Sequence, residues 1–232
     1  MRASIEITVS GGGGIKIGIY GGSFNPVHDG HICVCTGAAN ALGLDKVLMV
    51  VANVSPFKDG MDYITGEHRL AMCKIAAKAD RRIEVSDYEL LKDGISYTFD
   101  TVEYFAGKYP DSELFLILGS DAFADFNRWY KYKEILKKAS IAVVPRGKRQ
   151  AEFKTQQTAT ASPEFSGIQN LGAEDAVFVL KIRTPDISST QIREQIKFHK
   201  NFTCYLDENV VKYIEENIVD IGACLKSEQS RF

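Results

Sequence analysis

The chain has 232 residues, of which 45% are apolar and 25% are charged, a balance that is ordinary for a globular protein. Its formal net charge of -2 excludes the basic excess with which proteins bind nucleic acid without sequence preference. No apolar run reaches the length of a membrane span, and residues 1–10 lack the apolar block of a secretory signal, so we expect neither a membrane segment nor a leader.

The cysteines and the first glycines carry little chemistry. Five cysteines at irregular spacing do not resemble a disulfide framework, and free thiols in a reducing cytoplasm are the simpler interpretation. Four consecutive glycines at residues 11–14 predict a flexible joint. They lack the Lys-Ser/Thr ending of a P-loop and follow no clear strand. Residues 1–14 are therefore expected to form a flexible extension, and residues 15–232 a single folded domain.

Short apolar strands alternate with helices from residue 15 onwards. Strands are expected at residues 15–20, 46–52, 81–85, 113–118, 141–144 and 177–182. Helices are expected at residues 30–42, 66–79 (capped by Thr65), 97–108, between 122 and 138, and at 188–198 and 207–218. Residues 147–176 are polar without periodicity and predict a surface insert. The alternation predicts an α/β fold with a parallel sheet and a helical C-terminal part.

Ligands of such sheets bind at the carboxyl ends of the strands. The loops after Tyr20, Ala52, Leu118 and Val144 are therefore expected to lie on the functional edge. The loop after Tyr20 reads Gly-Gly-Ser-Phe-Asn-Pro-Val-His-Asp-Gly-His, between a predicted strand and a predicted helix. Glycines let the backbone approach a ligand, and a helix N-terminus offers free N–H groups to an anion.

Two histidines of this loop are spaced to act together. His28 and His31 lie on one face of the helix start, where both can donate hydrogen bonds to phosphate oxygens. A metal site is the rival interpretation, because Cys33 and Cys35 follow closely. Cysteines two apart on a helix point in different directions, however, and no second Cys/His cluster completes a tetrahedral set. Spare loop histidines are the remaining alternative.

A second polar segment covers residues 186–193. Ser188 and Gln191 fit a capping box, so a well-capped helix without further function is one interpretation. The other is an anion pocket at a helix N-terminus, since Ser188, Ser189 and Thr190 carry three hydroxyls and Arg193 follows one turn later. The segment alone does not separate the two.

Together the two segments resemble the nucleotidylyltransferase superfamily, with its His-x-Gly-His and Ile-Ser-Ser-Thr-x-x-Arg motifs. Further stretches make the chain resemble the bacterial-type nicotinate-nucleotide adenylyltransferases, in that family's order from residue 15 to about residue 198. The resembling stretches are residues 21–31, 55–58, 67–69, 96–101, 119–130 and 187–193. The chain departs from the family at Phe57 (usually His), Asn25 (often Asp) and Arg146, which follows Pro145 instead of preceding a proline.

The resemblance implies a Rossmann-like, doubly wound fold and transfer of the adenylyl group of ATP, with Mg²⁺, to nicotinate mononucleotide. It implies catalytic roles for His28, His31 and Arg193. The ATP and phosphate contacts would come from Gly21, Gly22, Ser23, Phe24, Lys58, Ser188, Ser189 and Thr190. The mononucleotide contacts would come from Thr98, Gly119, Asp121, Trp129 and Tyr130. Mg²⁺ would be held mainly by the ATP phosphates, with no protein metal site.

Several alternatives stay open. A sibling enzyme that uses nicotinamide mononucleotide or phosphopantetheine, a cytidylyltransferase, or a nucleotide-binding module without catalysis would share parts of the pattern. Trp129 is also a plausible core residue. His68 and Arg69 are expected on a solvated or salt-bridged helix face, and Thr101 is expected to support its helix. The sequence does not settle nicotinate against nicotinamide, nor whether the chain forms a homo-oligomer.

Overall fold

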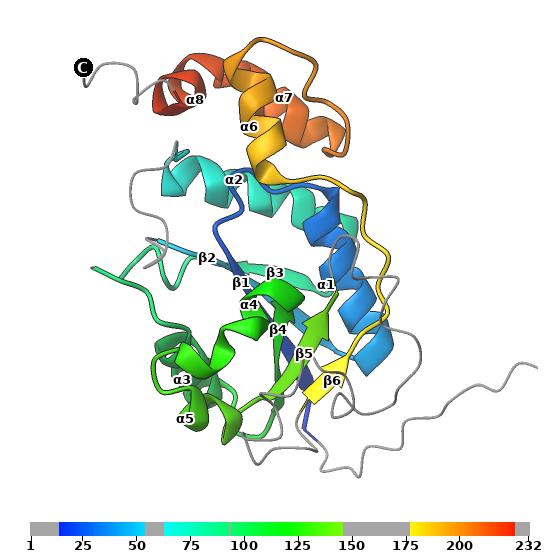
Figure 1. Ribbon diagram of the computed structural model, residues 1–232, viewed down its shortest axis with the longest axis vertical. Coiled ribbons are helices and arrows are strands. Elements are labelled where there is room, and N and C mark those ends of the chain that lie inside the picture. The colour runs from blue at the N-terminus through cyan, green and yellow to red at the C-terminus, as the bar shows by residue number, and fades with distance from the viewer. Residues whose placement is uncertain (1–13, 54–62, 93, 146–176, 226–232) are drawn as a thin grey trace, which may run out of the picture.

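Six parallel strands form one sheet in the order β3-β2-β1-β4-β5-β6 (Figure 1). The computed structural model describes residues 14–53, 63–92, 94–145 and 177–225. The strands are β1 (Lys16–Gly22), β2 (Lys46–Val51), β3 (Ile83–Ser86), β4 (Glu113–Gly119), β5 (Ser140–Val144) and β6 (Val177–Val179). The chain winds outward from β1 in one direction and from β4 in the other. The switch point of this doubly wound sheet therefore lies between β1 and β4, where ligands bind in such folds.

Eight α-helices and two short 3₁₀ turns accompany the sheet in the described part of the chain. The helices are α1 (Asp29–Leu42), α2 (Gly66–Ala76), α3 (Thr98–Lys108), α4 (Ser120–Ala124), α5 (Tyr132–Leu136), α6 (Ser189–Lys197), α7 (Glu208–Glu216) and α8 (Ile218–Leu225); the 3₁₀ turns are η1 (Ala77–Ala79) and η2 (Phe126–Arg128). All predicted strands and helices are present. The prediction was wrong about the start of β3 and the end of β6, and it missed α8 as a separate helix.

The strands are buried on both faces. In β2, Val47, Met49 and Val51 belong to one core cluster, while Leu48 and Val50 belong to the other. Because successive strand residues point to opposite faces, a continuous apolar run serves both clusters at once. Residues of α1, α2 and the C-terminal helices contribute to the first cluster, and residues of α3, α4 and α5 to the second. The sheet is thus the middle of three layers.

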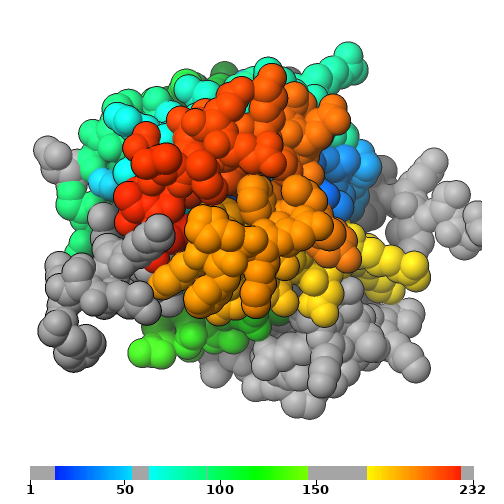
Figure 2. All heavy atoms as spheres, turned by 90° about the horizontal axis from the view of Figure 1, so that it is seen from above, coloured from blue at the N-terminus to red at the C-terminus, as the bar shows by residue number. Residues whose placement is uncertain are grey.

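Local signals set the helix ends. The hydroxyl of Thr65 accepts the N–H of His68, as its predicted capping role requires. Helix α1 ends at Gly43, whose φ of 64° lies in the left-handed region that glycine adopts without strain. Helices α6, α7 and α8 lie together at the top of the molecule next to α2, and Figure 2 shows them lying across that end. A hydrogen bond of 2.9 Å joins His68 Nδ1 of α2 to the Tyr213 hydroxyl of α7.

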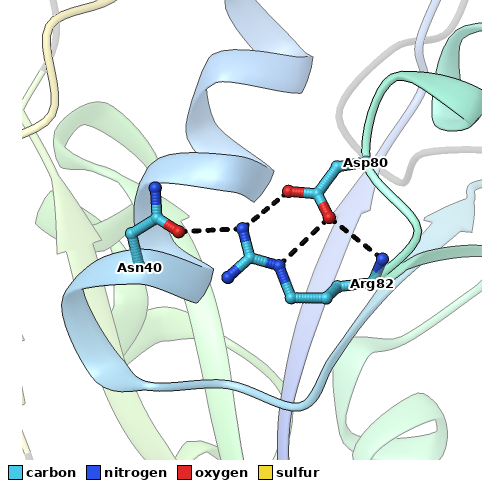
Figure 3. A network of polar contacts seen from close by, with 3 residues as sticks. All are labelled: Asn40, Asp80 and Arg82. Atoms are coloured by element: carbon cyan, nitrogen blue, oxygen red, sulfur yellow. Dashed lines mark hydrogen bonds and ion pairs between the residues drawn. The ribbon is translucent and has the colours of Figure 1, made fainter.

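A polar network holds the opposite, amino-terminal edge of the sheet (Figure 3). Arg82 donates to both carboxylate oxygens of Asp80, at 3.0 and 2.7 Å, and to Asn40 Oδ1 near the end of α1, at 2.8 Å. The hydrogen bonds that Asp80 accepts from Arg82 lower the pKa of this carboxyl to about 2. The Asp80 turn also explains why β3 starts later than predicted, since Ile83 donates its N–H to the Asp80 carbonyl.

Some predictions lie outside the described residues. They concern the extension before residue 14, the insert at 147–176, and the residues Phe57, Lys58 and Arg146. Among the helices that are described, none is long and apolar enough to cross a membrane.

Candidate active site

The predicted histidine pair sits where β1 ends and α1 begins. His28 is the N-cap of α1, and His31 lies in its first turn. The two imidazole rings are tilted against each other with centroids 3.8 Å apart. Only 8% of His28 and 9% of His31 are exposed, so each ring offers a narrow edge rather than a face. The structure therefore brings the pair together at the carboxyl end of β1, beside the switch point.

A backbone contact selects the tautomer of His31. Its Nδ1 lies 3.1 Å from the backbone N of His28 and accepts that N–H. In the neutral imidazole the proton must then sit on Nε2, which makes Nε2 the donor. Phe24 supports the ring from below, edge-to-face at 5.0 Å, and Tyr20 packs edge-on against Phe24 at 5.6 Å. His31 is thus a hydrogen-bond donor fixed by backbone and core.

Gly30 makes room for the His28 ring. A Cβ at this position would lie 2.9 Å from both Cε1 and Nδ1 of His28, closer than real Cβ atoms approach other atoms. The glycine between the histidines is therefore a steric requirement of the ring position, not only a choice of flexible backbone. The same Cβ would lie 3.8 Å from Ile187, which shows that the second motif packs against the first.

Helix α6 is bonded directly into the β1–α1 loop. Ser189 Oγ donates to the Pro26 carbonyl at 2.9 Å, and Arg193 Nη1 donates to the Asn25 carbonyl at 2.8 Å. Ser188 and Gln191 do form the predicted capping box. Capping and contact with the first motif are therefore compatible, because different hydroxyls serve them. Two segments more than 160 residues apart in sequence therefore meet where α1 and α6 begin.

The prediction for Arg69 was wrong. Its side chain is 1% exposed instead of lying on a solvated helix face. Nε donates to the Ile64 carbonyl at 2.9 Å, and Nη1 donates to the carbonyls of Ser23 and Ala52, each at 2.8 Å. Burial lowers the pKa of this guanidinium. Helix periodicity did not reveal the residue, because its partners are loop carbonyls from β1 and β2 that no local pattern identifies.

Asn25 and Phe24 are buried parts of the same loop. Asn25 Oδ1 accepts the N–H of Ile64 at 3.0 Å, which ties the loop to the segment before α2. The amide oxygen of Asn25 accepts a hydrogen bond that a carboxylate oxygen could also accept. The departure from the family at Asn25 therefore keeps this hydrogen bond. Phe24 is 1% exposed, so its ring serves the core and does not face a ligand.

Two of the residues predicted for the mononucleotide, Gly119 and Asp121, lie at the carboxyl end of β4 and in the helix that follows it, whereas Thr98 and Trp129 lie on other elements. Thr98 opens α3, and Gly119 is the N-cap of α4 directly after β4, the neighbour of β1. Asp121 is exposed in the first turn of α4. Trp129 is half-buried with its ring 5.5 Å from that of Phe126, so the core alternative holds in part.

An exposed aromatic group adjoins Trp129. Tyr130 is 49% exposed and its ring centroid lies 4.9 Å from that of Tyr97, the residue before Thr98. Lys131 places its Nζ 5.1 Å from the centre of the Tyr130 ring. The start of α3 and Tyr130 therefore share one exposed aromatic surface, next in sequence to Trp129.

Glu89 is a buried acid that the sequence did not single out. Thr101 Oγ1 donates to Glu89 Oε1 at 2.6 Å, and both residues are buried, so Thr101 supports its helix as predicted. Burial raises the pKa of Glu89, although the hydrogen bond from Thr101 acts in the opposite direction. The pair anchors the segment that leads into Thr98.

No group of three or more His, Cys, Asp or Glu side chains in the described ranges is arranged to hold a metal ion. The two cysteines of α1 differ in surroundings, since Cys35 is fully buried and Cys33 is half-buried. They do not complete a ligand set with His28 and His31. A divalent cation that enters with phosphates needs no such cage, because Mg²⁺ is commonly bound through substrate phosphates and waters.

Comparisons with known proteins agree with this geometry. Residues 19–195 match the family model described as cytidylyltransferase-like. The nicotinate-nucleotide adenylyltransferase of Bacillus subtilis (strain 168) is 32% identical over 202 residues, which cover 87% of this chain and 96% of the relative. A probable nicotinate-nucleotide adenylyltransferase of Thermotoga maritima is 34% identical over 204 residues, covering 87% and 92%.

Solved structures show the same fold. The Plasmodium falciparum nicotinic acid mononucleotide adenylyltransferase complexed with NaAD has a TM-score of 0.68 at 20% identity, over 89% of this chain and 98% of that one. Its complex with APC has a TM-score of 0.67 at 19% identity, over 89% and 97%. Nucleotidyltransferases of this family generally use a divalent metal. From the family model, the relatives and the joined motifs, the chain belongs to the nicotinate-nucleotide adenylyltransferases of the cytidylyltransferase-like family.

Proposed function

We propose that this chain transfers the adenylyl group of ATP to nicotinate mononucleotide, giving pyrophosphate and the deamido dinucleotide precursor of NAD. The observation that carries the proposal is the direct bonding of Ser189 and Arg193 to the loop of His28 and His31. Two anion-binding segments that meet at a switch point suit a triphosphate and an attacking phosphate. The names of the relatives support the same reaction.

The reaction needs no nucleophile from the enzyme. An oxygen of the mononucleotide 5′-phosphate attacks the α-phosphorus of ATP, and the bond from that phosphorus to the bridging β-phosphate oxygen breaks. The electron pair leaves with pyrophosphate, and no proton has to be removed because the attacking phosphate is already ionised. Positioning two anions and stabilising the charge that spreads between them is the protein's task.

His31 is the donor we assign to the α-phosphate. Its Nδ1 is engaged by the His28 backbone, so Nε2–H can point toward a phosphate oxygen without a change of tautomer. The His28 ring lies beside it at a tilt and would donate to a neighbouring oxygen. Neither ring is required to shuttle a proton. Preorganised donors of this kind need no rearrangement as charge develops.

The start of α6 is assigned to the leaving pyrophosphate. Ser188, Ser189 and Thr190 surround the helix N-terminus, where backbone N–H groups and the helix dipole favour negative charge. Arg193 adds a permanent positive charge one turn later. On the first loop, Gly21, Gly22, Ser23 and the backbone of Phe24 are the assigned partners, and Lys58 remains a prediction outside the described residues.

Mg²⁺ is proposed to enter as the ATP complex and to neutralise part of the triphosphate charge. For the mononucleotide we assign Trp129 as the stacking surface of the pyridine ring, with Tyr130 and Thr98 beside it and Gly119 and Asp121 toward the nucleoside. The aromatic surface shared by Tyr97 and Tyr130 supports this assignment. A free N–H at the start of α3 would suit a carboxylate, which favours nicotinate.

The proposal also covers organisation and location. Residues 15–232 would form one domain, with residues 1–14 as an extension and 147–176 as a surface insert. A cytoplasmic location suits the five cysteines, none of which is joined to another by a disulfide in the described part of the chain.

The test is pyrophosphate release from ATP and Mg²⁺, with nicotinate mononucleotide and nicotinamide mononucleotide compared in parallel. We expect turnover with the nicotinate substrate and a clear preference for it. Equal use of both would keep the adenylyl transfer and refute the assigned carboxylate contact. Absence of release with either substrate, but release with phosphopantetheine, would replace the function with that of a sibling transferase.

A further inference from the structure

We propose that Arg69 is a positioning residue of the reaction: its buried guanidinium holds the peptide bond between Ser23 and Phe24 so that the Phe24 N–H faces the phosphates of the bound nucleotide. This inference rests on the proposed function, because the phosphates concerned are those of its substrates. It adds a residue that contacts neither substrate and that acts through the loop carrying them.

Arg69 joins three segments that converge at the carboxyl edge of the sheet. Its two bonds from Nη1 reach the β1–α1 loop at Ser23 and the end of β2 at Ala52, and Nε reaches Ile64 before α2. The Tyr63 ring covers the guanidinium at 4.7 Å. In the described part of the chain Arg69 forms no ion pair, so carbonyl oxygens and an aromatic ring hold this buried cation without a carboxylate. Such a group is costly to bury, and an apolar side chain would fill the space more cheaply.

The contact at the Ser23 carbonyl fixes the direction of the Phe24 N–H, because both groups belong to one planar peptide. The C=O and the N–H of one trans peptide point in opposite directions. Since the Ser23 oxygen is turned toward Arg69, the N–H of Phe24 points away from Arg69. Across the residues that the structure describes, this N–H has no hydrogen-bond partner. An N–H so directed is suited to an anionic ligand.

The conformation of Phe24 shows that this peptide is held in place. Its φ of 43° lies in the left-handed region, which a bulky residue adopts only when its surroundings demand it. Two restraints are visible: the ring is locked under His31, and the preceding carbonyl is locked by Arg69. Without the second restraint the peptide is free to rotate toward a commoner conformation, which would turn the N–H away.

The neighbouring carbonyls are treated in the same way. The Asn25 oxygen is held by Arg193 and the Pro26 oxygen by Ser189. Three of the four carbonyl groups of residues 23–26 are therefore engaged by side chains from α2 and α6. A phosphate is repelled by carbonyl oxygens and attracted by N–H groups, so engaging these oxygens prepares the loop for an anion. Arg69 serves the Ser23 carbonyl, which the α6 side chains do not engage.

The planar fork of arginine is needed for this task. One nitrogen, Nη1, donates to carbonyls from two different strand ends, while Nε serves a third. A lysine ammonium is a single point on a flexible stem and does not reproduce this fixed arrangement. A methionine fills much of the volume but donates nothing.

The experiment compares Arg69→Met and Arg69→Lys with Arg82→Met as the matched control. The Arg82 side chain also donates three hydrogen bonds but lies at the opposite edge of the sheet, in the network with Asp80 and Asn40 (Figure 3). Turnover and both Michaelis constants are measured well below the melting temperature of each variant. We expect Arg69→Met to lose turnover by about 10²-fold, as for a displaced reacting geometry, and Arg82→Met to lose less than about twofold. Arg69→Lys is expected to recover no more than about tenfold.

A second readout follows the Phe24 amide itself in protein labelled with ¹⁵N-phenylalanine. Addition of Mg²⁺ and ATP should shift this resonance in the wild type and in Arg82→Met, and should leave it unshifted in Arg69→Lys or Arg69→Met. The inference would be overturned if ATP shifted the Phe24 resonance of either Arg69 variant as much as that of the wild type. It would also be overturned if ATP did not shift this resonance in the wild type. Because the wild-type titration needs no variant, a failure of Arg69→Met to fold does not remove the test.

The two proposals fail separately. If the wild type releases no pyrophosphate with nicotinate mononucleotide, yet its Phe24 amide responds to ATP only when Arg69 is present, the function is refuted and the positioning role stands. If the enzyme turns over and the amide shift survives in Arg69→Lys, the role is refuted and the function stands.

Discussion

Replacing Gly30 by alanine should separate stability from activity. The new Cβ would lie 2.9 Å from the His28 ring, where contact between carbon atoms is comfortable only at about 3.5–4.0 Å. The atoms it meets are at the far end of a side chain, so the imidazole must move by about 0.5–1 Å while the backbone stays. His28 would leave its place against His31, and the helix would survive.

The two expected magnitudes differ widely. Alanine is favoured over glycine in a helix by about 0.5–1 kcal/mol, and an off-rotamer histidine costs about 0.5–1.5 kcal/mol, so these terms nearly cancel. We therefore expect the melting temperature to move by less than about 4 °C. Turnover should fall by about 10- to 100-fold, the range expected when a reacting geometry is displaced by up to 1 Å.

The assay pairs thermal melting with pyrophosphate release under saturating ATP, Mg²⁺ and nicotinate mononucleotide. Gly107→Ala is the control, because Gly107 lies exposed in α3 with no atom within 4 Å of an added Cβ. It should gain about as much helix stability and keep full turnover. Wild-type turnover in Gly30→Ala, alongside a large loss in His28→Ala, would refute the argument that this glycine sets the position of His28.

Three further predictions address other parts of the site. His31→Ala should lower turnover by about 10²–10³-fold in the same assay, the loss expected for one preorganised donor; full turnover in a folded variant would exclude the assigned role. Trp129→Ala should raise the Michaelis constant for nicotinate mononucleotide by about tenfold or more and leave that for ATP nearly unchanged, as for a lost stacking partner. Burial raises the pKa of Glu89, so the native state binds its proton more tightly than the unfolded chain, and this residue's contribution to stability falls as pH rises from about 4.5 through the raised value. Glu89→Gln should remove that fall in denaturant titrations across this pH range; an unchanged pH profile would contradict it.

Much of the fold was predictable because the sheet is parallel and buried. Continuous apolar runs such as that of β2 serve both core clusters, so they stand out from the polar helix faces between them. Element ends were less certain where side chains compete with the ladder. The turn at Asp80 moves the start of β3 to Ile83. The break between Glu216 and Ile218, which separates α7 from α8, contains no Gly or Pro that would have indicated it.

The candidate site was predictable where the type of a side chain itself indicates its role. His28, His31, Ser188 and Arg193 lie in compact segments whose residue types point to anions, and the structure does bring these segments together. Arg69 was misplaced because a helix pattern reports neighbours on the same helix, whereas its partners are carbonyls of two other segments. Every residue has a backbone carbonyl, so no pattern of residue types reveals which carbonyl accepts a hydrogen bond from a distant side chain.

The same limit bears on how this site selects anions. The first loop has few cationic side chains of its own, and its attraction for phosphate depends on which of its peptide groups face the ligand. Ser189 and Arg193 from α6 and Arg69 from α2 determine that orientation from a distance in sequence. The loop and the remote residues are therefore one functional unit: a change at Arg69 is expected to act like a change in the loop, although no atom of Arg69 is assigned to a substrate. A substitution elsewhere on α2 that leaves these carbonyl contacts intact should not have that effect.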